Sequence, residues 1–163
     1  MIKVVKFGGS SLADAEQFRK VGRIIRKDAD RRYVVPSAPG KRTPDDTKVT
    51  DMLYGCYGVA IMEAEEGEEE FESRLEKIKE RYDEIIEGLG LSMDLTDEFR
   101  MIRENFIRKT GRDYAASRGE YLNGRIMAEY LGYPFIDAAD VIIFDEDGNF
   151  DAKKTDQVLA EVL

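Results

Sequence analysis

The feature that most constrains this chain lies near its start, where residues 3–11 read Lys-Val-Val-Lys-Phe-Gly-Gly-Ser-Ser. The apolar run predicts a short buried strand over residues 4–7, and the two glycines predict a turn directly after it. A backbone without Cβ atoms can approach a phosphate closely, and Lys6 would place a positive charge beside its N–H groups. The stretch therefore suggests phosphate binding, although many α/β proteins use such a turn without a ligand.

Residues 12–60 favour an α/β fold. Apolar side chains after the glycine turn recur at helical spacing, at Leu12, Ala15, Phe18, Val21 and Ile25. Residues 33–36 predict a second buried strand, residues 37–42 are rich in turn formers, and residues 49–60 predict a helix that Thr47 can cap. This order of strand, helix, strand and helix favours a parallel sheet covered by helices.

From residue 63 the composition shifts to charge. Apolar residues at steps of three and four predict a long amphipathic helix over residues 63–90, with a seam of Phe71, Leu75, Ile78, Tyr82, Ile85 and Leu89. A second helix starting at Thr96 is expected to pair with it, which gives a helical hairpin inserted into the sheet domain at about residues 63–110. The clustered Glu65, Glu66, Glu68, Glu69 and Glu70 read as a solvated helix start rather than as a metal site.

The remainder predicts a helix over residues 115–131 that ends at Gly132, and a last helix that starts near Lys154. Between them, Asp-Glu-Asp-Gly-Asn at residues 145–149 predicts a hairpin turn. The segment lacks the ligand spacing and the terminal glutamate of a calcium-binding loop, so the turn is preferred.

Composition excludes several classes of function. The 163 residues carry a net charge of −9, which argues against nucleic acid or an anionic membrane as the general partner. The single cysteine, Cys56, and the absence of histidine exclude a disulfide framework, Cys-based metal sites within one chain and histidine-dependent nucleophilic schemes. With no membrane-spanning run and no signal peptide, we expect a cytoplasmic protein.

Three places could combine into one site: the turn with Lys6, the loop from Ser37 to Thr50, and residues 117–120, where a helix is expected to begin. Loops that follow the carboxyl ends of parallel strands gather at one sheet edge, where ligands bind. Ser37, Thr47 and Thr50 offer hydroxyls, and Glu120 offers an anion for an ammonium group.

Each of these residues also has a purely structural interpretation. Thr47 or Thr50 could cap a helix, Glu120 could be a first-turn carboxylate, and Ser37 could be a turn residue. A P-loop is rejected because Val35 stands where it needs glycine, and a dinucleotide fingerprint is rejected because the third glycine is missing.

Taken together, four segments resemble the amino-terminal part of the aspartokinases, which belong to the amino-acid-kinase family. They are residues 6–11, residues 37–42 with 48–53, residues 119–122, and residues 135–138, in the family's order along nearly the whole chain. The resemblance implies an incomplete three-layer αβα fold with a mainly parallel sheet. It implies transfer of the γ-phosphate of ATP to the side-chain carboxylate of L-aspartate, the first step of lysine, threonine and methionine biosynthesis.

The resemblance also implies residue roles. Lys6 would be catalytic, Lys6, Gly8, Gly9 and Ser10 would surround the ATP phosphates, and Ser37, Thr50 and Glu120 would bind the amino acid. Mg²⁺ would be held mainly through the nucleotide phosphates, with no metal ligands from this chain, and the parent protein would form a homodimer or larger assembly.

Some family features are missing from the sequence. The glycine-rich segment that follows later in the family, the nucleotide-binding half and the regulatory ACT domains are absent, so we expect residues 1–163 to be an inactive amino-terminal fragment. Asn123 also stands where a serine is common. Two alternatives remain open: another carboxylate or carbamate kinase of the same family, or a non-catalytic α/β module that dimerises through the seam from Phe71 to Leu89.

Overall fold

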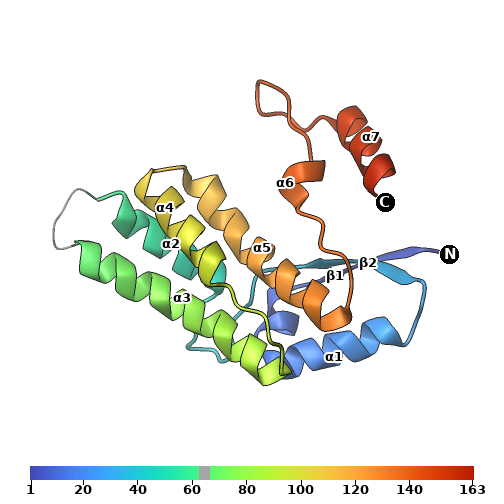
Figure 1. Cartoon of the computed structure of the whole chain (residues 1–163), viewed down its shortest axis with the longest axis horizontal. Coiled ribbons are helices and arrows are strands. Elements are labelled where there is room, and N and C mark those ends of the chain that lie inside the picture. The colour runs from blue at the N-terminus through green and yellow to red at the C-terminus, as the bar shows by residue number, and fades with distance from the viewer. Residues whose placement is uncertain (63–66) are drawn as a thin grey trace. The chain divides into compact units, whose positions relative to one another are not determined.

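The computed structural model describes residues 1–62 and 67–163, which divide into two compact units, Met1–Tyr133 and Pro134–Leu163 (Figure 1). Each unit is described by itself. Glu65 and Glu66, and the first residues of the helix expected over 63–90, lie outside the described residues.

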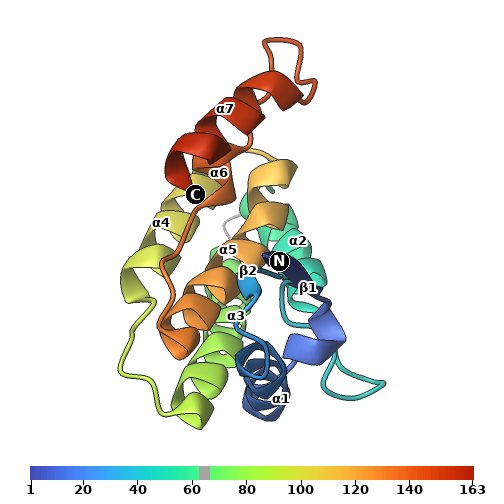
Figure 2. The same ribbon diagram turned by 90° about the vertical axis from the view of Figure 1, so that its right-hand side faces the viewer.

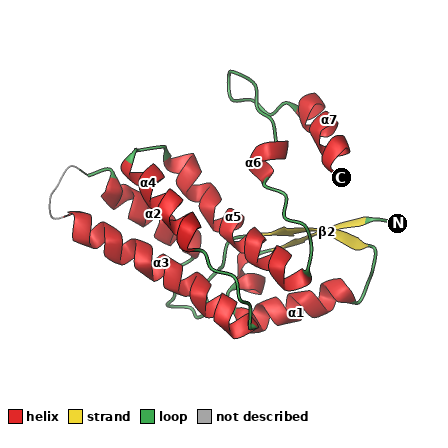
Figure 3. Ribbon diagram, viewed as in Figure 1, coloured by secondary structure: helices red, strands yellow, loops and turns green. Residues whose placement is uncertain are grey.

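The first unit opens with a strand, a turn and a helix, as predicted, but the expectation that the two strands are buried was wrong. No residue of either strand is fully buried, and Val4 and Val35 are 68% and 48% exposed, because the described residues cover only part of the two-stranded sheet. Strand β1 (Lys3–Phe7) leads into a short 3₁₀ turn, η1 (Gly9–Leu12), and then into helix α1 (Ala15–Arg26). The side chain of Asp14 caps α1 by accepting a hydrogen bond from the backbone N–H of Gln17 at 2.9 Å. Strand β2 (Arg31–Pro36) lies alongside β1 (Figure 3) and parallel to it, as predicted. In this pairing Lys6 is opposite Val35.

Four helices complete this unit: α2 (Val49–Ala60), α3 (Gly67–Leu89), α4 (Thr96–Ile107) and α5 (Arg112–Leu131). Gly132 ends α5 as predicted, with the left-handed φ of 71° that a glycine tolerates and with Tyr133 N–H donating back to the carbonyl of Ala128. The expected cap of α2 was wrong. Lys48 occupies the N-cap position, and no side chain of the residues that the structure describes makes a capping hydrogen bond, so neither Thr47 nor Thr50 caps the helix.

Among the described residues of this unit, one hydrophobic core joins helices α1 to α5. It contains buried side chains from each, for example Phe18 of α1, Leu53 of α2, Ile78 of α3, Phe106 of α4 and Leu122 of α5. Val5, Phe7 and Val34 of the two strands pack against its edge. Helices α3 and α4 do pair, as predicted, and Figures 1 and 2 show them running beside α2 and α5.

The amphipathic seam of α3 is therefore part of the core and not an outlying surface. Phe71, Leu75, Ile78, Tyr82 and Ile85 are all at most 6% exposed within one chain. This burial contradicts the alternative in which the seam is free to hold two copies together. The periodicity identified an apolar face correctly, but the face is covered by this chain's own helices.

The second unit contains helices α6 (Ala138–Val141) and α7 (Ala152–Val162). Between them, an antiparallel bridge between Phe144 and Phe150 closes the hairpin turn predicted for residues 145–149. The hydroxyl of Thr155, buried at 3% exposure, accepts a hydrogen bond from the N–H of Ile143 at 2.9 Å and so ties α7 to the segment before the turn.

Within residues 1–62 and 67–163, no helix combines the length and the apolar character that crossing a bilayer requires.

Candidate functional site

The glycine turn presents unpaired hydrogen-bond donors. Lys6 is exposed near the end of β1, and its ammonium group has no hydrogen-bond or ion-pair partner in the part of the chain that the structure describes. Nor, among those residues, do the backbone N–H groups of Gly8, Gly9 and Ser10 donate to any protein acceptor. A lysine two residues before three N–H groups without a protein acceptor supplies donors suited to an anion such as a phosphate.

The turn is fixed against the loop that follows β2. Gly40 N–H donates to the carbonyl of Gly9 at 2.9 Å. A Cβ on Gly9 would lie 2.8 Å from the Ala38 carbonyl oxygen, and one on Gly40 would lie 2.6 Å from the Gly9 carbonyl carbon. Only glycine at both positions allows this backbone-to-backbone approach, which brings the loop beside the predicted phosphate turn.

Helix α5 holds the beginning of the same loop. Glu120 Oε1 accepts a hydrogen bond from Ala38 N–H at 3.2 Å, and Asn123 Nδ2 donates to the carbonyl of Ser37 at 2.6 Å. Ser37 N–H continues the strand pairing by donating to the carbonyl of Phe7 at 3.0 Å. Glu120 lies well inside α5, so the expectation of a helix start at residues 117–120 was wrong.

Thr50 lies in the first turn of α2, which the loop also positions. Val49 N–H, at the start of that helix, donates to the carbonyl of Pro39 at 3.1 Å. No hydrogen bond of the Thr50 hydroxyl is found among the described residues. The turn of Gly9, the loop of Ser37, the start of α2 and Glu120 are thus joined by direct contacts.

Arg81 of α3 also binds this loop, a role that was not predicted from the sequence. Its side chain is 4% exposed and donates to the Gly40 carbonyl at 3.1 Å and to Asp46 Oδ2 at 2.9 Å. Longer contacts reach the carbonyls of Ala13 and Thr47, while its Nε has no partner within the described residues.

The helical spacing did indicate that Arg81 is buried, because it lies three residues after Ile78 and four before Ile85, on the buried face of α3.

The charges around Arg81 keep Asp46 ionised. Burial opposes ionisation, but hydrogen bonds from the Arg42 side chain and from the backbone of Arg42 and Thr47, with the charge of Arg81, hold the pKa of Asp46 well below its usual value. Burial, together with the charge of Arg42, lowers the pKa of Arg81, although arginine stays protonated in proteins.

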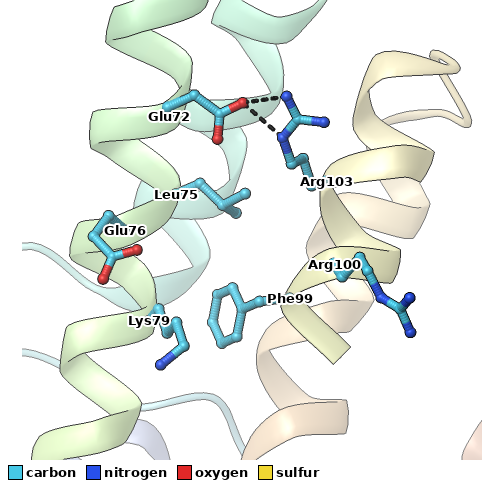
Figure 4. Close-up of a pocket in the computed structure, with 7 residues that line it drawn as sticks. All are labelled: Glu72, Leu75, Glu76, Lys79, Phe99, Arg100 and Arg103. Atoms are coloured by element: carbon cyan, nitrogen blue, oxygen red, sulfur yellow. Dashed lines mark hydrogen bonds and ion pairs between the residues drawn. The ribbon is translucent and has the colours of Figure 1, made fainter. Parts of the chain in front are cut away.

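Two surface cavities are present in the described part of the chain, and of the candidate site residues only Thr47 lines either of them. One, of about 200 Å³, separates α3 from α4, with Leu75 and Phe99 facing it and Glu72 joined to Arg103 at its upper end (Figure 4). The other, of about 270 Å³, borders the Arg42, Asp46 and Arg81 cluster. Neither is lined by Lys6 or Glu120, and no group of three metal-ligating side chains converges within the described ranges.

Comparison with known proteins identifies relatives along the whole chain. The model of the amino acid kinase family matches residues 1–162. Aspartokinase 3 of Bacillus subtilis (strain 168) is 33% identical over 161 residues, which cover 91% of this chain and 34% of that protein. Aspartokinase 2, chloroplastic, of Arabidopsis thaliana is 31% identical over 140 residues, which cover 78% of this chain and 24% of that protein. The chain thus spans about a third of the length of the first relative.

Solved structures of aspartate kinases also match this chain. The crystal structure of Clostridium acetobutylicum aspartate kinase matches 98% of this chain and 36% of its own chain, with 48% identity and a TM-score of 0.91. The structure of E. coli aspartokinase III in complex with aspartate and ADP matches 99% of this chain and 37% of its own, with 22% identity and a TM-score of 0.75. These matches confirm the predicted fold, an incomplete αβα arrangement with a parallel sheet.

Proposed function

The chain belongs to the amino acid kinase family, and on that premise we propose that it is the amino-acid-binding part of an ATP-dependent aspartate kinase. The proposed reaction transfers the γ-phosphoryl group of ATP to the side-chain carboxylate of L-aspartate and yields 4-phospho-L-aspartate and ADP. The similarity to the Clostridium acetobutylicum and Bacillus subtilis aspartokinases supports this substrate choice. The observation that carries it is the contact of Glu120 with Ala38, next to Ser37, at the edge of the sheet that also carries Lys6.

In the proposed mechanism, an oxygen of the substrate's side-chain carboxylate attacks the γ-phosphorus, and the bond to the β,γ-bridging oxygen breaks. This chemistry requires positioning and charge stabilisation and no covalent nucleophile from the protein, in accord with the absence of histidine. Lys6 stabilises the negative charge on the transferring group, while the N–H groups of Gly8, Gly9 and Ser10 bind phosphate oxygens. Mg²⁺ would be held mainly through the nucleotide phosphates rather than by side chains of this chain, and it would neutralise phosphate charge there.

The amino acid is recognised by the groups near the loop after β2. Glu120 uses Oε1 for Ala38 N–H, and no described residue pairs with its second oxygen, which is therefore open to the substrate ammonium group. The hydroxyls of Ser37 and Thr50 complete the proposed set of substrate contacts. We further propose a cytoplasmic location, in keeping with the single reduced Cys56, and a homodimer or larger assembly for the parent protein.

A hybrid enzyme tests the proposal. The segment of Clostridium acetobutylicum aspartate kinase that matches this chain is replaced by residues 1–163, and phosphorylation is measured with Mg-ATP and candidate acids. We expect aspartate-dependent release of ADP and an acyl phosphate that hydroxylamine traps. Turnover with another carboxylate or with carbamate, and none with aspartate, would assign the chain to a different kinase of the family.

A further inference from the structure

One peptide group of the site is held at both of its polar ends by the same helix. The carbonyl of Ser37 and the N–H of Ala38 belong to a single peptide unit, and they contact Asn123 and Glu120 of α5 at 2.6 and 3.2 Å. No peptide bond in the described chain is cis, so this carbonyl and this N–H point in opposite directions. The unit cannot rotate without breaking one of the two hydrogen bonds.

Packing alone does not explain an asparagine at position 123. Its side chain is 0% exposed, and its Oδ1 has no hydrogen-bond partner in the part of the chain that the structure describes. A buried amide oxygen left unpaired is costly, and an apolar side chain of similar size would avoid that cost. The other half of the amide, Nδ2, donates to the Ser37 carbonyl.

The spacing between α5 and the loop is fixed independently of Asn123. A Cβ on Gly119 would lie 2.7 Å from the Cβ of Ala38, so this glycine lets the helix approach the loop closely. The hydroxyl of Tyr82 donates to the carbonyl of Gly119 at 2.9 Å and anchors the same turn of α5 to α3. Removing the Asn123 amide therefore leaves the loop beside α5 but frees one end of the peptide unit.

We propose that Asn123 is a positioning residue for the amino acid substrate: by holding the Ser37 carbonyl while Glu120 holds the Ala38 N–H, it sets the orientation of the Ser37–Ala38 peptide and aims Ser37 at the substrate. The proposal rests on the proposed aspartate kinase function. In this arrangement Glu120 uses one carboxylate oxygen for the Ala38 N–H, and its second oxygen is left for the substrate.

Kinetics of the hybrid enzyme provide the first test. Asn123→Leu keeps the branching at Cγ and removes the donor, and Asn123→Asp keeps the shape and removes the donor at neutral pH. Losing one neutral hydrogen bond that orients a substrate contact should raise KM for aspartate about tenfold, with KM for ATP changed by less than about twofold. Met127→Ala is the matched control, since Met127 is 2% exposed one turn further along α5 and should affect stability without this selectivity.

Amide hydrogen exchange of the 163-residue chain provides the second test and needs no activity. The Ala38 amide should exchange faster in Asn123→Leu than in the unmodified chain, and Met127→Ala should leave it protected. Unchanged Ala38 protection in Asn123→Leu overturns the proposal, as does an equal rise of both KM values in an active hybrid. If the unsubstituted hybrid does not phosphorylate aspartate, the proposed function fails, and the substrate role of Asn123 fails with it.

Discussion

At the scale of single residues, the side chains proposed to bind ligands are exposed, and the side chains that hold the loop in place are buried. Lys6 and Glu120, the charged groups proposed to face ligands, are exposed, whereas Arg81 and Asn123, which hold the loop, are at most 4% exposed. The exposed set could be proposed as ligand contacts from the sequence, because a lysine before two glycines has a local chemical meaning, and these roles stay predictions. The buried set could not, because its role depends on which backbone carbonyl the fold places opposite each side chain.

Lys6→Ala should separate activity from stability. Because the ammonium group has no partner among the described residues, its removal should change the free energy of unfolding by less than about 0.5 kcal/mol. Loss of a preorganised charge at the transferring phosphoryl group should lower kcat of the hybrid enzyme by about 10²–10³-fold. Urea unfolding of the chain and steady-state kinetics of the hybrid are the two measurements. Retained kcat would remove Lys6 from the mechanism.

The thiol of Cys56 should not react with thiol reagents while the chain is folded. It is 0% exposed in α2, and burial raises the pKa of its thiol to about 12, so almost none is thiolate at pH 8. We expect no reaction with a disulfide reagent at pH 8 until denaturant unfolds the core, with labelling then following the loss of helical circular dichroism. Rapid labelling without denaturant would show that α2 and α3 separate locally.

At the scale of elements, the sequence pattern predicted the strands, the helices and two of their pairings, β1 with β2 and α3 with α4, but not what covers the apolar face of α3. The spacing of Phe71, Leu75 and Ile78 correctly predicts one apolar face on α3. The same spacing does not say whether that face meets the chain's own α2 and α5 or a second copy, since both would bury it equally well. Arg81 shows a related gap: a charged residue on an apolar face is interpretable only once its acceptors on the loop are known.

The stability that the contact between α3 and the loop of residues 41–48 contributes to the fold should depend on pH. Because the folded-state pKa of Asp46 is depressed, its stabilising contribution is complete above the unfolded pKa, about 4, and is lost as the pH falls from there towards the folded value. Asp46→Asn should cost about 3 kcal/mol near pH 6.5, since it leaves Arg81 buried without its counter-ion. Urea unfolding of both chains should show this difference shrinking at pH 3 and below. A difference that stays constant with pH would contradict the ion pair's role.

At the scale of the whole molecule, stability should reside in the first unit. Every buried residue of the main hydrophobic core lies between Leu12 and Met127, and its partly buried neighbours end at Leu131. The second unit, Pro134–Leu163, contributes no residue to that core and leaves Phe144 and Phe150 more than half exposed.

A chain truncated after Tyr133 should therefore fold by itself. The cap formed by Gly132 and Tyr133 would be kept, so α5 would retain its end and would continue to hold Ser37 and Ala38. We expect one cooperative thermal transition within a few degrees of that of the full chain, and amide chemical shifts for residues 3–131 that largely superpose on those of the full chain. Loss of cooperativity, or widespread shifts around Ala38, would mean that residues 134–163 are needed to form the site, because the core alone would then be insufficient to order it.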